Sequence, residues 1–132
     1  MTTSDLPAEG QPDVSSEGTE APFDDVITLS TSTSEDGVVT VTVVGEVDTF
    51  TAPVLRSTLD SQLEQQPREL VIDLSGVQFL GSAGLAVLVE TQKSSRAREV
   101  ALRLIATTRA VTRPLEVTGL IDLFTIADST AR

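Results

Sequence analysis

The residue of this sequence best placed for chemistry is Ser82, which lies in the segment Phe79-Leu80-Gly81-Ser82-Ala83-Gly84 after an apolar run. This segment is expected to turn into a helix that begins at Ser82. As the N-cap of that helix, the serine Oγ would accept a hydrogen bond from a backbone N–H of the first turn, which contributes about 1 kcal/mol. A helix N-terminus also presents free N–H groups and partial positive charge, so a phosphate on Ser82 would add about -1.5 to -2 charges without opposing the helix. From the pattern alone, capping is the better-supported interpretation.

Ser82 is a poor candidate for a catalytic nucleophile. A hydrolase elbow of the form G-x-S-x-G requires glycine where Leu80 stands. The sequence contains no histidine to act as a base, and its single lysine, Lys93, would project from the helix about three turns away from the serine. The sequence therefore predicts a protein that is not an enzyme.

Other patterns that could carry chemistry are incomplete. Asp73 ends an apolar run, as the phospho-accepting aspartate of a receiver domain does, but the acidic pair and the late lysine of a receiver are missing. We expect Asp73 to be a polar strand end. Glu46 and Asp48 form a close carboxylate pair with no further acids beside them, and cysteine is absent, so no metal site is predicted. There is no phosphate-binding G-x-x-x-x-G-K-[ST] loop, and we expect no cofactor.

Composition narrows the possible partners. The 132 residues carry 20 acidic and 9 basic side chains, a formal charge of -11 and a pI near 4.2. Nucleic acid is not expected as a partner, because phosphate backbones require clustered Lys and Arg. No apolar run reaches the roughly 18–20 residues that cross a bilayer, and the N-terminus lacks the basic start and apolar stretch of a signal peptide. We therefore expect a cytoplasmic protein without a membrane span.

Residues 1–25 differ in composition from the rest of the chain. They hold seven acidic side chains and no Lys or Arg, and Pro, Gly, Ser and Thr fill most of the remainder. Such a stretch buries too little apolar area to offset the entropy lost on ordering. We expect a disordered, solubilising acidic tail at 1–25 and a single domain at 26–132.

The domain alternates strand-like and helix-like patterns. Asp36-Gly37 is a hairpin-turn dipeptide, so the first two strands should pair antiparallel. Strands are expected at 26–30, 38–44, 70–74, 100–106 and 124–127, and helices after Thr51, from Ser82 and from about Thr108 to Thr118. The order β-β-α-β-α-β-α-β predicts an α/β fold with a central mixed sheet packed by helices.

The second and third helices carry further signals. The apolar stripe of the second is expected to end at Gln92. In the third, Pro114 should kink the helix or shift its start, and Gly119 followed by Leu120 fits a Schellman stop.

Several segments, taken in order, resemble the STAS domain of the anti-sigma-factor antagonist family. Gly45-Glu46-Val47-Asp48 followed by Thr51-Ala52 resembles the family's G-E-[LV]-D-x-x-T-A element. Residues 71–75 followed by 79–85 resemble its strand, loop and phosphoserine helix, and Gly119-Leu120 with Phe124 matches residues near its end. The resemblance covers about residues 26–127. It departs from the family at Gly81, where aspartate is common, and in a C-terminal helix that is short or missing.

The resemblance implies partner switching. An unphosphorylated antagonist of this family binds an anti-sigma factor and so frees a sigma factor for transcription. The anti-sigma factor is usually also a serine kinase of the histidine-kinase-like ATPase fold, which phosphorylates the serine that aligns with Ser82; a metal-dependent serine phosphatase restores binding. The partner surface implied here comprises the loop from Ser75 to Gly81, the first turn of the second helix and the Asp48-to-Thr51 loop, with the expected contacts Asp48, Thr49, Thr51, Ser75, Gly81, Ser82, Ala83 and Gly84.

Two alternatives remain open at this point. The protein could be a STAS-like accessory adaptor subunit of a membrane lipid-transport ATPase, without a phosphorylation cycle. Other hydroxyls could also accept phosphate, although each is expected to be an ordinary polar surface position; they are Ser75, Thr91, Ser94 and Ser95.

Overall fold

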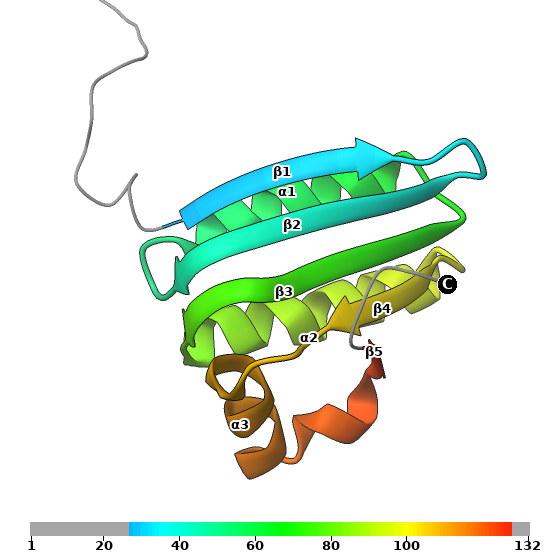
Figure 1. The fold of residues 1–132 in the computed structure, drawn as a ribbon. Helices are drawn as coiled ribbons and strands as arrows, with labels where there is room; N and C mark the ends of the chain where they lie inside the picture. Colours follow the sequence, from blue (N-terminus) through cyan, green and yellow to red (C-terminus); the bar gives the residue numbers. More distant parts are fainter. Residues whose placement is uncertain (1–26, 128–132) are drawn as a thin grey trace, which may run out of the picture.

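The computed structural model describes residues 27–127, which form one mixed α/β unit (Figure 1). Its elements are β1 (Ile27–Thr33), β2 (Val38–Val47), α1 (Ala52–Glu64), β3 (Glu69–Leu80), α2 (Ser82–Ala97), β4 (Ala101–Ile105), α3 (Arg109–Val117), the 3-10 helix η2 (Leu120–Leu123) and β5 (Thr125–Ala127). The predicted order of strands and helices is confirmed. The acidic segment 1–25 lies outside the described residues.

The five strands form a single sheet in the order β1-β2-β3-β4-β5. β1 and β2 are antiparallel, as the Asp36-Gly37 turn predicts, and every later pair is parallel. Because parallel neighbours end at the same edge of a sheet, β2 and β3 bring the segments that follow them together: Val47 pairs with Leu80. This edge carries the site described below.

The core lies between the sheet and its helices, with α1 and α2 on the same side of the sheet (Figure 1). On β2, the valines at positions 39, 41, 43 and 47 are buried and alternate with more exposed residues over most of the strand. Leu55, Leu59 and Leu63 of α1 are fully buried against them, as their spacing of four predicts. Among the described residues, no helix is long and apolar enough to cross a membrane.

Strand β3 is much longer than the sequence predicts. It continues from Leu74 through Leu80, so Asp73 lies inside the strand rather than at its end, and the predicted Ser75–Gly81 loop is strand as far as Leu80. The prediction was wrong because Ser75 and Gly76 favour loops locally, whereas the strand continues through them. Gly76 pairs with Val44 of β2, and Ser75 lies at a register shift between the paired residues Asp73 and Gly76. Gly76 fits beside β2 because it has no side chain: a Cβ there would lie 2.9 Å from Val44 Cγ2.

Polar residues extend the buried face of α2 beyond its apolar stripe. Thr91, Gln92 and Ser95 are all buried, so the packed face of α2 continues past Gln92. The hydroxyls of Thr91 and Ser95, which were expected at the surface, are therefore inside the protein. Thr91 Oγ1 donates to the carbonyl of Val87 at 2.8 Å, and Ser95 Oγ donates to that of Gln92 at 2.8 Å. These bonds within the helix satisfy the hydroxyls without external partners.

The third helix begins and ends near the predicted residues. Thr108 occupies the N-cap position but makes no side-chain cap bond, and Pro114 lies inside the helix without shifting its start. Gly119 follows the helix with a left-handed φ of 77°, and its N–H donates to the carbonyl of Glu116 at 3.1 Å. The glycine stop is therefore confirmed.

Replacing Gly119 with alanine should isolate the cost of this backbone conformation. A Cβ at Gly119 would meet nothing within 4 Å, so steric overlap does not contribute. A left-handed φ costs an L-residue about 1–2 kcal/mol, and we expect Gly119→Ala to lower the free energy of unfolding by that amount. Urea denaturation checks this, with Gly119→Asn as the matched variant that should lose less. Equal stability of wild type and Gly119→Ala would contradict it.

Candidate functional site

A hollow of about 250 Å³ lies where β2 and β3 end, and it is called the Ser82 hollow here. Five of the eight residues expected at the partner surface line it together with Phe79; they are Asp48, Thr49, Gly81, Ser82 and Ala83. The hollow is therefore built by the loop after β2, the end of β3 and the first turn of α2. Parallel pairing of β2 with β3 places these three segments side by side.

The loop after β2 is held by its own side chains. Asp48 Oδ1 accepts hydrogen bonds from the backbone N–H groups of Phe50 and Thr51, both at 3.0 Å. Thr51 Oγ1 donates to the carbonyl of Glu46 at 2.8 Å and accepts from the N–H of Asp48 at 2.9 Å. Together these bonds fix the backbone that carries Asp48 and Thr49 at the edge of the hollow.

Thr51 stabilises the loop after β2 and is not part of the exposed surface. It occupies the N-cap position of α1, but it makes no side-chain bond to the helix, and its exposed fraction is 2%. The predicted cap is right in position, while the hydroxyl bonds back to the preceding loop instead. Thr51 does not line the hollow, so it positions the residues that do.

Ser82 is the first residue of α2, and the N-cap is Gly81. The predicted N-cap role of Ser82 is wrong. Gly81 has an extended backbone, its N–H donates to the Val47 carbonyl at 2.9 Å, and its carbonyl accepts the N–H of Leu85 at 3.0 Å. Those two bonds make Gly81 the cap, while the helix itself begins at Ser82 as expected. Ser82 is exposed, and no described residue forms a hydrogen bond with its hydroxyl.

The first turn of α2 gives the hollow a positive end. Within residues 27–127, no carbonyl accepts a hydrogen bond from the N–H groups of Ser82, Ala83 or Gly84. Free N–H groups and the dipole of a 16-residue helix place partial positive charge there. The lining includes the carboxylate of Asp48 but neither lysine nor arginine. An anionic group on Ser82 would thus lie at the N–H end of the helix, in a hollow whose lining also includes a carboxylate.

Gly84 sets how closely α2 approaches the sheet. It is buried, and a Cβ there would lie 2.6 Å from Val47 Cγ1 and 2.7 Å from Leu80 Cδ1. Glycine therefore allows the first turn of α2 to rest directly on the ends of β2 and β3. Gly84 is a packing residue beneath the hollow and does not line it.

Ser75 stands apart from the other expected contacts. It lies on β3 and does not line the hollow, and both its N–H, at 3.0 Å, and its Oγ, at 2.7 Å, donate to Asp73 Oδ1.

Two aromatic residues near the hollow lie within the ranges expected at the partner surface but were not among its expected contact residues. Phe79 lines the hollow and is 51% exposed, and Phe50, in the loop after β2, is 73% exposed. Large exposed apolar side chains beside a polar hollow are typical of a protein interface. The signal that could have found Phe79 is strand alternation: Leu80 is buried, so its neighbour points to the other face. The described residues hold no cluster of three or more metal-ligating side chains.

Changing Gly84 to alanine tests how the hollow is built. Overpacking of a dense core costs about 1–3 kcal/mol, and we expect Gly84→Ala to lose stability in that range and to displace the first turn of α2. The matched control is Gly81→Ala, whose Cβ would lie 3.0 Å from the ring of Phe79. This variant should lose less stability, because the exposed ring can move aside. Thermal denaturation and the amide shifts of Ser82 and Ala83 report the outcome. Equal losses for the two variants would count against the assigned contact.

Comparisons with known proteins agree on a family. Residues 30–132 match the STAS domain family. The anti-sigma-F factor antagonist RsfB of Mycobacterium tuberculosis is 34% identical over 100 residues, which cover 76% of this chain and 80% of that protein. An anti-sigma-B factor antagonist of Staphylococcus aureus is 29% identical over 99 residues, covering 75% and 92%.

Solved structures show the same arrangement. An anti-sigma factor antagonist from Mycobacterium paratuberculosis superimposes with a TM-score of 0.74 at 38% identity, covering 85% of this chain and 92% of that one. Unphosphorylated SpoIIAA, at 15% identity, shares the fold with a TM-score of 0.64, covering 76% and 88%. The chain therefore belongs to the STAS domain family, and its relatives in that family are anti-sigma-factor antagonists.

Proposed function

We propose that this protein is an anti-sigma-factor antagonist whose binding surface surrounds the Ser82 hollow and is switched off by phosphorylation of Ser82. Relatives at 34% and 29% identity that carry this function in their names support the role. The observation that carries the switch is the state of Ser82: an exposed hydroxyl with no hydrogen-bond partner among the described residues, at the first position of α2.

Phosphorylation at this position leaves the fold intact. The Ser82 hydroxyl holds no structural bond that the phosphate would break, and the free N–H groups of the first turn favour an anion at that end of the helix. The modification therefore acts on the surface rather than on stability. A protein of the same fold, SpoIIAA, has been solved in both unphosphorylated and phosphorylated forms.

The same modification changes what the surface can bind. In the unmodified protein the hollow combines the exposed ring of Phe79 with one carboxylate, Asp48. A phosphate adds about -1.5 to -2 charges beside that carboxylate, and no basic side chain lines the hollow to neutralise them. A partner that covers Phe79 would then have to desolvate a dianion without a counter-charge from this chain. Such burial is costly, so one phosphate suffices to release the partner.

Two further proteins complete the cycle. The anti-sigma factor would itself be the kinase, of the histidine-kinase-like ATPase fold, and a serine phosphatase would return Ser82 to the binding form. Gly81 precedes the serine in this chain. Without a side chain there, the kinase would recognise the first turn of α2 and the Asp48 loop rather than an acidic residue next to the serine.

Variants of Ser82 test the switch. We expect Ser82→Ala to bind the anti-sigma factor with unchanged affinity in the presence of ATP, and Ser82→Glu to bind at least tenfold more weakly. The charge-matched control is Ser61→Glu, an exposed position on α1 away from the hollow, which should leave affinity within about twofold. Calorimetry with the purified anti-sigma factor measures all three. Equal affinity for Ser82→Ala and Ser82→Glu would remove Ser82 from the switch.

Phe79 tests the surface independently of charge. A large exposed ring at the centre of an interface commonly contributes more than 1 kcal/mol to binding, so Phe79→Ser should weaken the complex about tenfold without unfolding the domain. Val117 on α3 provides the control because it is also exposed, at 71%, and does not line the hollow. If Val117→Ser weakens binding as much as Phe79→Ser, the interface lies elsewhere.

A further inference from the structure

A second and larger hollow, of about 440 Å³, lies at the opposite end of the sheet from Ser82, beside the β1–β2 turn. Thr40, Val71 and Arg103 are neighbours in register on β2, β3 and β4, and all three line it. Each follows a residue of the helix-covered core on its strand, such as Val39 before Thr40, so its side chain projects from the other face of the sheet. This hairpin-end hollow is therefore separate from the core and from the Ser82 hollow.

The lining of the hairpin-end hollow is rich in hydrogen-bond donors. Most of its members are hydroxyl or guanidinium side chains, and the complete lining is Ser32, Thr33, Ser34, Asp36, Val38, Thr40, Arg68, Val71 and Arg103. Two arginines and one carboxylate line it, and a second carboxylate, Glu69, lies next to it as the ion-pair partner of Arg103. Its volume falls in the range of small-molecule sites, about 300–1,000 Å³.

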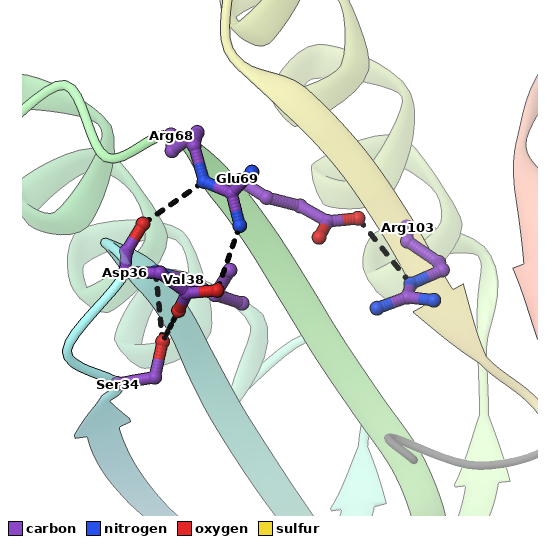
Figure 2. A network of polar contacts seen from close by, with 6 residues as sticks. All are labelled: Ser34, Asp36, Val38, Arg68, Glu69 and Arg103. Atoms are coloured by element: carbon purple, nitrogen blue, oxygen red, sulfur yellow. Dashed lines mark hydrogen bonds and ion pairs between the residues drawn. The ribbon is translucent and has the colours of Figure 1, made fainter. Parts of the chain in front are cut away.

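The Asp36 carboxylate is already engaged by groups of the turn. Arg68 donates from Nε to the Asp36 carbonyl and from Nη2 to Asp36 Oδ2, both at 2.9 Å, and Ser34 Oγ donates to Asp36 Oδ1 (Figure 2). These bonds fix the Arg68 guanidinium at the rim of the hollow. The carboxylate that could repel an anionic ligand is thereby neutralised in place.

Arg103 carries more hydrogen-bond donors than the described residues around it provide acceptors. Its side chain is only 14% exposed, and its one ion-pair partner is Glu69, with Nε 3.3 Å from Glu69 Oε2 (Figure 2). Arg103 Nε is buried without a hydrogen bond, and no other described residue accepts a bond from this guanidinium. Buried polar groups in folded proteins nearly always find partners, and a guanidinium carries five N–H donors. A largely buried arginine with one loose partner, lining a hollow, indicates that an acceptor from outside the fold completes it.

We propose that the hairpin-end hollow binds the anionic group, carboxylate or phosphate, of a small molecule. The terminal N–H groups of Arg103 are the main donors, and Arg68 with the hydroxyls of Ser32 and Thr40 completes the set. The geometry suits an anion because planar guanidinium groups hold carboxylate and phosphate oxygens by paired bonds. The site is independent of the proposed switch, since none of its residues lines the Ser82 hollow.

Titration of the full chain with inorganic phosphate at constant ionic strength tests this site, with backbone amide shifts as the readout. We expect saturable shifts at Thr33, Thr40 and Arg103, and at least tenfold weaker binding in Arg103→Gln. The matched control, Arg113→Gln, removes an exposed arginine on α3 and should leave the affinity unchanged. Shifts that do not saturate, or shifts confined to the first turn of α2, would overturn the proposal.

A second variant separates a binding role from a structural one. Glu69→Gln keeps Arg103 but removes the carboxylate that competes for it, so we expect phosphate to bind several-fold more tightly. A purely structural ion pair predicts the opposite, because losing it would loosen β3 and β4 and weaken the site. The proposal fails if Glu69→Gln binds phosphate no better than wild type. This arm remains informative even if Arg103→Gln does not fold.

Discussion

The structure depends above all on the parallel pairing of β2 with β3 and on the helix that packs against their ends. Val47 pairs with Leu80, and Gly84 lies so close to both side chains that even a Cβ there would force a shift. This contact fixes the first turn of α2 beside the loop that follows β2. Without it, Ser82 and Asp48 would be separate surface features, because they lie 34 positions apart in the sequence.

The Ser82 hollow combines a buried framework with an exposed surface. Its framework is made by buried groups: the Thr51 hydroxyl bonds within the loop after β2, and Gly84 lies beneath the helix. Ser82 and Phe79 of its lining are exposed side chains, and the Ser82 hydroxyl makes no hydrogen bond with a described residue. A charge added at Ser82 can therefore alter what the surface binds while the framework stays folded, and the proposed switch requires this separation.

The order of strands and helices could be read from the sequence because each element carries a strong local pattern. The valines of β2 and the leucines of α1 have the periodicities of a buried strand and an amphipathic helix, and Gly119 ends α3 as expected. The second half of β3 could not be read in this way, since Gly76 pairs with Val44 of β2 and Ser75 lies at the register shift before it. The identity of the α2 cap depends equally on a distant contact, the bond from Gly81 N–H to the Val47 carbonyl. Of the contact residues that the resemblance implies, five line the hollow, whereas Thr51 and Gly84 are buried by tertiary packing.

In the proposed switch, a phosphate on Ser82 releases the partner. The most direct measurement is intact-mass and phosphopeptide analysis of the purified complex with the anti-sigma factor after addition of Mg-ATP, with the bound fraction followed in parallel. We expect one added phosphate, located on Ser82, and dissociation of the complex at the same rate as the phosphate is added. A complex that stays intact after Mg-ATP is added, with no phosphate on Ser82, would contradict the proposed switch and favour a permanent adaptor role for this domain.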